Sequence, residues 1–278
     1  MPHELRRAPG DIKPTMTDQD VLDFCKKGLF VLEGVIPDRT NHWVSEYLNQ
    51  EGNDSQTLLE EERFVEEVLL NPKVSGVTRS LLGERFQLPD WMANHRLVGP
   101  QKTKNWHMDA GSKFERTCNL LQVFYIPQAN TNEMGPTLFL PGSHLVPIPR
   151  EELEHFGHLA GQVATVGPAG SVFFTAYSIW HRQSEKVDSS TRNVLKWVTW
   201  RTVPPKRDWI IGNDFEFTRV DYSYTNDYFC GPARKWQSVL RVSEMFYWLC
   251  GKSEEFHVVG GAGWPFSASD PRGWAPQR

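Results

Sequence analysis

The chain has 278 residues with a formal net charge of −4, and 39% of its residues are hydrophobic, including 16 Phe and 11 Trp. This length and apolar content suffice for a buried core without disulfides or structural metal, and they exclude a disordered or coiled-coil chain. The slight acidity provides no basic surface for a phosphate backbone. We therefore expect a small-molecule partner and no nucleic acid.

The cysteines and the N-terminal residues indicate the compartment. Cys25, Cys118, Cys230 and Cys250 form no C-x-x-C pair, so neither a thiolate zinc site nor a disulfide framework is expected. Residues 1–17 contain no apolar core segment and the sequence has no long apolar run, so we expect no signal peptide and no membrane span. These features predict a cytoplasmic protein.

The first third of the chain is predicted to be mostly helical. A helix begins after a cap at Thr17 or Asp18 and ends at Gly28, and the following "LFVLEGVI" has the composition of a strand. A second helix is expected at about 39–50, and two more are separated near Asn71-Pro72. The acidic run "LLEEERFVEEVL" is interpreted as the solvated face of a helix.

From about residue 92 the sequence predicts antiparallel strands of a sandwich or barrel. Short runs rich in β-branched and aromatic residues alternate with turn residues: "NLLQVFYIP", "PTLFLPGS", "AGSVFFTAYSIWH" and "RNVLKWVTWRTVP". A helix-like stretch at 233–250 has periodic apolar residues that are expected to pack on the barrel: Trp236, Val239, Leu240 and Met245. We expect a single domain over 1–278, with a flexible tail at 1–17 and an aromatic-rich extension at 206–278 packing on the core.

The motif His107-x-Asp109 is the first candidate for a metal site. Alone it carries little weight, because short motifs arise by chance. Side chains at i and i+2 of a strand share a face, so the pair is able to chelate one ion. A mononuclear iron site needs a third ligand, and His181 ends a long β-like run. Arg192 follows eleven residues later, and a hairpin of that length would bring its guanidinium beside His181 to hold a carboxylate.

Other polar residues compete less well for the same roles. Arg182 adjoins His181 and should face the opposite side, while Arg201 lies at the far end of its strand, so Arg192 is preferred. His144 is expected to be structural, because turn histidines mostly bond backbone groups. One further pair lacks a carboxylate of matching strand geometry: His155 and His158.

The arrangement H-x-D, a distal His and an Arg at +11 resembles the phytanoyl-CoA dioxygenase family of iron(II)- and 2-oxoglutarate-dependent oxygenases. "GLFVLEGVIP" resembles the N-terminal strand segment of that family, and "MGPTLFLPGSH" resembles its Gly-containing strand that ends in P-G-S-H. The likeness extends from about residue 17 to about residue 203. It implies a mainly β fold with flanking helices around a double-stranded β-helix, the jelly-roll or cupin-like core.

Carried over by position, the resemblance makes His107, Asp109 and His181 the iron(II) ligands and Arg192 the partner of the distal 2-oxoglutarate carboxylate. It implies an enzyme that uses O2, decarboxylates 2-oxoglutarate to succinate and hydroxylates a small metabolite, with desaturation, epimerisation or cyclisation open to the same oxidant. Asp109 disfavours halogenation, since halogenating relatives have a small residue there.

The resemblance also implies contacts with 2-oxoglutarate beyond the arginine. Thr137 matches a position that often hydrogen-bonds the cosubstrate, and Tyr125 matches an aromatic residue that lines its pocket. Two positions depart from the family pattern. Gln183 stands where members often have Ser, and Lys104 stands where some have a cosubstrate-binding Gln.

Two alternatives from other classes remain open at this point. Two His and one Asp also suit zinc with a hydrolytic water, although the arginine at +11 then has no role and no general base stands out. A non-catalytic cupin-like metabolite-binding barrel is the other alternative.

The substrate is not specified by the sequence, and a lipid thioester, an amino acid or a natural-product scaffold are all open. Candidate pocket residues are Asn94, His95 and Arg96, with Arg96 or Lys104 as partners for an acidic group, and Trp264 in the tail. We expect a monomer or a homodimer.

Overall fold

The computed structural model describes residues 6–224 and 232–256, which contain ten short strands and a set of flanking helices. The helical elements are α1 (Asp18–Lys27), α2 (Asp38–Asn49), η1 (Thr57–Glu60), α3 (Glu62–Phe64), η2 (Val65–Leu69), α4 (Pro72–Leu82), η3 (Ser143–Leu145), α5 (Arg150–Leu153), α6 (Pro232–Leu249) and α7 (Ser253–Phe256). The strands are β1 (Leu29–Leu32), β2 (Met92–Asn94), β3 (Leu97–Val98), β4 (Leu120–Ile126), β5 (Thr137–Phe139), β6 (Val163–Ala164), β7 (Ser171–Ala176), β8 (His181–Gln183), β9 (Thr191–Arg192) and β10 (Leu195–Trp200).

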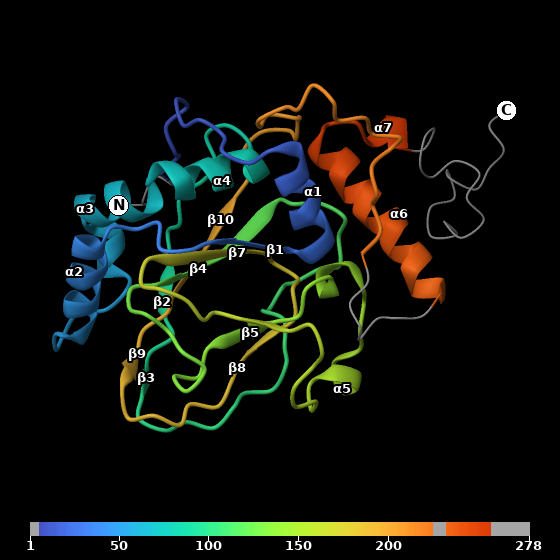
Figure 1. Cartoon of the computed structure of the whole chain (residues 1–278). Coiled ribbons are helices and arrows are strands. Elements are labelled where there is room, and N and C mark those ends of the chain that lie inside the picture. Colours follow the sequence, from blue (N-terminus) through green and yellow to red (C-terminus); the bar gives the residue numbers. More distant parts are fainter. Residues whose placement is uncertain (1–5, 225–231, 257–278) are drawn as a thin grey trace, which may run out of the picture.

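The strands form three antiparallel sheets. The largest has the order β1-β7-β4-β10-β2, a second has the order β6-β5-β8, and β3 pairs with β9. In Figure 1 helices α1 and α4 lie above the large sheet, and β5 and β8 lie below it. The large sheet is therefore covered by helices on one face and by the second sheet on the other.

Alternation along the central strand β4 separates the two faces of the large sheet. Val123 and Tyr125 belong to the main core cluster, which they share with residues of the covering helices. Phe124 and Ile126 belong to a second cluster that includes Phe139 of β5 on the opposite sheet. The space between the sheets is consequently a distinct, aromatic-rich interior, and side chains on its face of β4 are available to a site there.

Both predicted ends of the first helix are confirmed. Thr17 caps α1 in a capping box with Asp20, and Gly28 ends the helix in the left-handed region with φ of 66°. The strand after it is shorter than expected, because β1 ends at Leu32. The second helix covers 38–49, and the helix after Asn71 is capped by the Asn71 side chain.

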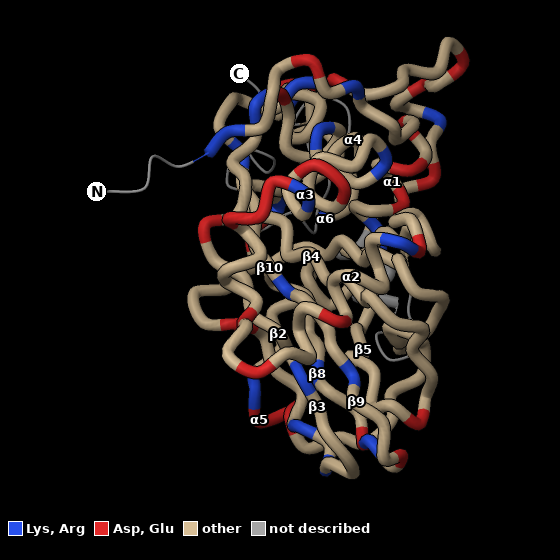
Figure 2. The backbone as a smooth tube through the Cα atoms, turned by 90° about the vertical axis from the view of Figure 1, so that its left-hand side faces the viewer, with Lys and Arg blue, Asp and Glu red and all other residues tan. Residues whose placement is uncertain are grey.

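The acidic run at 58–69 forms η1, α3 and the π-helix η2. Its glutamates lie on the outer side while Phe64 and Val68 are buried. Figure 2 shows the acidic band along α3. The prediction of a solvated helical face is therefore confirmed.

Four expectations need correction. Residues 6–17 are not a loose tail, because Ala8 and Met16 are buried and Ala8 N–H donates to Phe86 O at 2.8 Å. The run 169–181 is not one strand, since the chain turns after β7 and β8 begins at His181. Helix α6 lies most closely against the N-terminal helix α1, and it shares the main core cluster with the large sheet, so the barrel is only one of the surfaces on which it packs. The helices contain more residues than the strands, so β structure does not predominate.

Apolar residues of α6 do form a buried stripe, as the periodicity indicates. Val242, Met245 and Phe246 lie in the main core cluster, and Val239 and Leu240 are half-buried. The Trp236 side chain and Trp264 lie outside the part of the chain that the structure describes. In that part, no helix combines the length and the apolar character needed to cross a membrane.

Gly28 is required where α1 meets the P-G-S-H turn. Its φ is positive, and a Cβ at this position would lie 2.4 Å from Nδ1 of the buried His144 ring. We predict that Gly28→Ala lowers the free energy of unfolding by about 3 kcal/mol through left-handed strain and overpacking. Gly52→Ala, at φ of 87° with open space around it, should cost only about 1 kcal/mol. Equal losses in urea denaturation would contradict this contact.

His144 makes the stability depend on pH. The ring is fully buried with Nε2 3.1 Å from Cys25 O, and burial lowers its pKa from 6.5 to about 4. Between pH 6.5 and 4 the unfolded chain therefore binds more protons than the folded protein. The contribution of neutral His144 to the unfolding free energy is complete above pH 6.5 and is lost as the pH falls through this window, about 3 kcal/mol in total. His144→Gln should reduce the slope of the unfolding free energy against pH in this window, where His95 also contributes, and an unchanged slope would contradict the assignment.

Candidate metal centre

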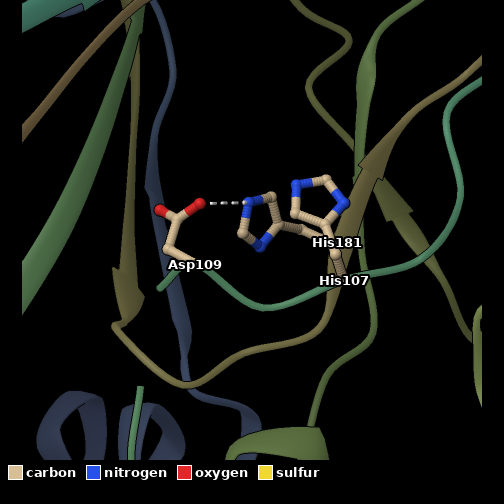
Figure 3. Close-up of side chains that lie close together, drawn as sticks. All are labelled: His107, Asp109 and His181. Carbon is tan, nitrogen blue, oxygen red and sulfur yellow. Dashed lines mark ion pairs between the residues drawn. The ribbon is translucent and has the colours of Figure 1, made fainter. Parts of the chain in front are cut away.

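His107, Asp109 and His181 come together between the sheets. One ligand atom from each lies within 4.8 Å of the other two. Asp109 Oδ1 is 3.6 Å from His181 Nε2, and the two imidazole centroids are 4.5 Å apart (Figure 3). The backbones of the two histidines also exchange a pair of hydrogen bonds, at 3.0 and 2.9 Å. The predicted triad is thus assembled on an antiparallel bridge between residues 74 positions apart.

Both imidazoles are oriented for ligation through Nε2. His107 Nδ1 lies 2.8 Å from Asn105 O, and His181 Nδ1 lies 3.0 Å from Ile179 O. A carbonyl accepts only from a protonated ring nitrogen, so Nδ1 carries the hydrogen and Nε2 presents a lone pair, as in most protein metal sites. His181 Nε2 is buried without a hydrogen-bond partner among the described residues. An ion between the three side chains would satisfy it.

The local backbone differs from the sequence-based expectation. His181 opens β8 rather than ending a strand, and it follows the tight segment 177–180. His107 lies in a loop with a single bridge residue rather than in a regular strand. Asp109 nevertheless converges with His107, because the bridge to His181 fixes the loop at its centre.

Asp109 is held from the sheet by two donors. Its Oδ2 accepts hydrogen bonds from Gln122 Nε2 on β4 and from Lys196 Nζ on β10. Burial alone would raise the pKa of Asp109, but the contact with His181 and the charge of Lys196 outweigh it and lower the pKa. The carboxylate is therefore ionised, with Oδ1 turned toward the imidazoles.

Sequence reasoning missed Gln122 and Lys196. Both are polar residues in otherwise apolar strands, "LLQVFYI" and "LKWVTW", and both are buried. A buried lysine or glutamine in a central strand needs a polar partner, so these two residue types in apolar strands could have indicated a polar site between the sheets. Lys196 also lies four residues after Arg192, at a spacing that places it on the same face if the strand is regular.

Arg192 is 1% exposed and has no carboxylate partner among the described residues. It donates through Nη1 to Gly135 O and through Nη2 to His95 O at 3.0 Å, while Nε has no partner. Burial lowers its pKa to about 10, so it remains charged. The expected hairpin beside His181 does not form, because β9 pairs with β3. An unpaired buried guanidinium suits an anionic ligand.

Thr137 and Gln183 share the inner face with His181. Phe139 is opposite His181 and Thr137 is opposite Gln183 in the β5–β8 pair. Residues two apart in a strand lie on one face, so both side chains point to the interior that holds the triad. Arg182 faces the side opposite to His181, as expected, where it is buried with its guanidinium 5.1 Å from the centre of the Trp106 ring.

Three residues that were expected near the pocket point away from it. Tyr125 lies on the helix side of β4, and its hydroxyl donates to Asn41 of α2 at 2.8 Å. Asn94 donates to Asn193, and Arg96 donates to the carbonyl of Leu48 at the end of α2. All three were placed by sequence distance from the motif or by resemblance, neither of which determines the face of a strand.

His95 does turn toward the interior. Burial, together with the charges of Lys196, Arg192 and Lys104, lowers its pKa from 6.5 to about 3. His181 is also within electrostatic reach of the ring. Arg192 and Lys104 therefore lie close to the same neutral imidazole, although Lys104 itself is exposed.

The competing residues lie elsewhere. Arg201 donates to Leu81 O and packs against the Trp248 ring. His155 stacks on Phe156, while His158 is bonded to Gln162.

Several solved structures have a similar fold. The chain is similar to the alpha ketoglutarate dependent epimerase SnoN from nogalamycin biosynthesis, with 15% identity, a TM-score of 0.53, and coverage of 66% of this chain and 82% of SnoN. It is similar to iron-bound EctD from S. alaskensis (17%, TM-score 0.54, coverage 71% and 84%) and to iron-bound HygX from Streptomyces hygroscopicus (14%, TM-score 0.55, coverage 70% and 90%). EctD has also been solved with 2-oxoglutarate.

Fold and site together define a non-haem iron(II)- and 2-oxoglutarate-dependent oxygenase. The model of the phytanoyl-CoA dioxygenase (PhyH) family matches residues 12–194, and the chain belongs to this family. No curated protein matches the sequence. Iron(II) is accordingly the metal cofactor, with 2-oxoglutarate and O2 as cosubstrates, and family membership favours neither the zinc hydrolase nor the non-catalytic barrel.

The contribution of the Asp109–Lys196 ion pair to the unfolding free energy should be measurable in the metal-free protein. Asp109→Ala leaves Lys196, whose side chain is 7% exposed, without its carboxylate. We predict a loss of about 2 kcal/mol in the unfolding free energy of chelator-treated protein, and recovery of most of it in Asp109→Ala/Lys196→Met, since a buried unpaired charge is the source of the cost. Additive losses in the double variant would contradict this.

Proposed function

We propose that this enzyme oxidises a small-molecule metabolite, with iron(II) held by His107, Asp109 and His181. The observation that carries the proposal is the convergence of three ligand atoms within 4.8 Å, with both imidazole Nε2 lone pairs turned to one point. Two imidazoles and a carboxylate leave further positions of an octahedral ion open, as this oxygenase chemistry requires.

We further propose that the two facing sheets are a double-stranded β-helix, the jelly-roll of cupin-like proteins. In support, all sheet pairings are antiparallel, and the triad lies between the two sheets. The main core cluster joins the N-terminal helices, the large sheet and α6, which supports a single domain over residues 1–278.

When bound, iron and 2-oxoglutarate would activate O2 for oxidation of the substrate, and the 2-oxoglutarate would be converted to succinate and carbon dioxide. The chain's own residues supply position and a dry environment. The imidazoles are fixed by their carbonyl partners, and Phe124 and Phe139 pack around His181 with ring centroids 6.1 and 6.2 Å away. These rings limit water beside the ligands, which strengthens electrostatic contacts in the site.

In this proposal Arg192 binds the distal carboxylate of 2-oxoglutarate. It is buried, charged and without a carboxylate of its own, and its remaining N–H groups are able to form a charge-assisted pair. Thr137 and Gln183, on the same inner face as His181, supply hydrogen bonds to the cosubstrate, and Lys104 contributes positive charge at its edge. Tyr125 is left out of this set.

Asp109 occupies the position that halogenating relatives leave open, so hydroxylation is the default outcome of this proposal, with desaturation, epimerisation or cyclisation open to the same oxidant. His95 is the proposed substrate-facing residue of the 94–96 segment. A monomer or homodimer in the cytoplasm is proposed, which fits the free, buried thiols of Cys25, Cys118 and Cys250.

Arg192→Gln tests the cosubstrate site. We predict that the 2-oxoglutarate concentration for half-maximal succinate formation rises at least about tenfold, because a charge-assisted pair is lost, while the iron(II) requirement changes little. Arg201→Gln is the matched control, since Arg201 is half-buried and also bonded to backbone carbonyls but lies on the helix side. Equal effects of the two variants, or equal effects on both requirements, would contradict the role of Arg192.

A further inference from the structure

We propose that Lys196 and Gln122 are positioning residues that force Asp109 to bind the metal through one oxygen only. The proposal rests on the metal site proposed above and concerns the side chains behind it. Both residues belong to the large sheet, and among the three metal ligands they contact only Asp109.

The two donors approach the same carboxylate oxygen from neighbouring strands. Lys196 is opposite Phe124 in the β10–β4 pair, and Gln122 lies two residues before Phe124 on the same inner face. Lys196 Nζ and Gln122 Nε2 both donate to Asp109 Oδ2. Oδ2 is thereby occupied, whereas Oδ1 faces His181 Nε2 at 3.6 Å.

The donors are themselves fixed by the sheet. Gln122 Oε1 accepts a hydrogen bond from Thr175 Oγ1 of β7 at 3.3 Å, and Thr175 Oγ1 also lies 3.2 Å from Gln122 O. Thr175 and Gln122 are 0% exposed, so water does not compete for these groups. Polar side chains from three adjacent strands, β7, β4 and β10, are therefore connected through the Asp109 carboxylate.

Lys196 is poised for this role by its surroundings. Its side chain is 7% exposed, and its one ion pair within the described residues is with Asp109. The ammonium also lies 5.4 Å from the centre of the Phe124 ring. A buried ammonium with a single anionic partner does not leave it readily, because the alternative is an uncompensated buried charge.

Single-oxygen ligation has a chemical consequence. A carboxylate free to use both oxygens would occupy two positions on the ion, whereas a carboxylate with Oδ2 held by two donors offers one. The position that is saved remains open to cosubstrate, substrate or oxygen. Removing a hydrogen-bond partner of a metal ligand typically weakens metal binding about 10–100-fold, because the partner orients the ligand.

Cobalt(II) titration of the metal-free full-length protein, followed by visible absorption, tests the proposal without turnover. We predict that Gln122→Met and Lys196→Met each weaken cobalt binding about tenfold or more and change the absorption spectrum, because the freed carboxylate changes its ligation. Thr175→Val, which only releases Gln122, should produce a smaller change in the same direction. This nearly isosteric variant keeps the test available if a larger change prevents folding.

Lys186→Met is the control, because Lys186 is another buried lysine paired with an aspartate, Asp188. It should lose stability but keep wild-type cobalt affinity and spectrum. Wild-type affinity and spectra in the Gln122, Lys196 and Thr175 variants would overturn the proposal, and so would tighter binding by Lys196→Met, since Lys196 would then act only as a repelling charge. If His107→Ala leaves wild-type cobalt binding unchanged, the metal site itself fails, which is a separate result.

Discussion

The structure depends on a set of polar groups that the two sheets remove from water and then satisfy internally. His107 and His181 donate to backbone carbonyls, and Asp109 accepts from Lys196 and Gln122. A buried ion or amide without a partner would cost several kcal/mol, so each partner is needed for the fold as well as for the site. Two of the buried polar atoms that have no partner among the described residues, His181 Nε2 and Arg192 Nε, lie at the positions proposed for metal and cosubstrate.

Local sequence signals predicted the helical layer well. Caps and apolar periodicity act over a few residues, so α1, with Thr17 before it and Gly28 after it, could be placed closely. Strand partners depend on contacts between distant residues, which no local pattern specifies. The pairing of β9 with β3 and the turn before His181 were therefore not foreseen.

The metal triad was predictable because residue type, spacing and family resemblance agreed on the same three side chains. The surrounding residues were less predictable because a one-residue error in register moves a side chain to the opposite face. Tyr125 and Arg96 were placed in the pocket but face α2. Lys196 was overlooked although it faces the triad, since charge in a central strand was not treated as a signal.

Anaerobic addition of iron(II) and then 2-oxoglutarate to the metal-free protein tests the central claim most directly. If the triad holds iron and Arg192 holds the cosubstrate, a weak visible charge-transfer band appears with the wild type at one equivalent of metal, and His181→Ala does not form it. A wild-type protein that binds iron(II) but develops no such band with saturating 2-oxoglutarate, or a band that survives in His181→Ala, would contradict the account.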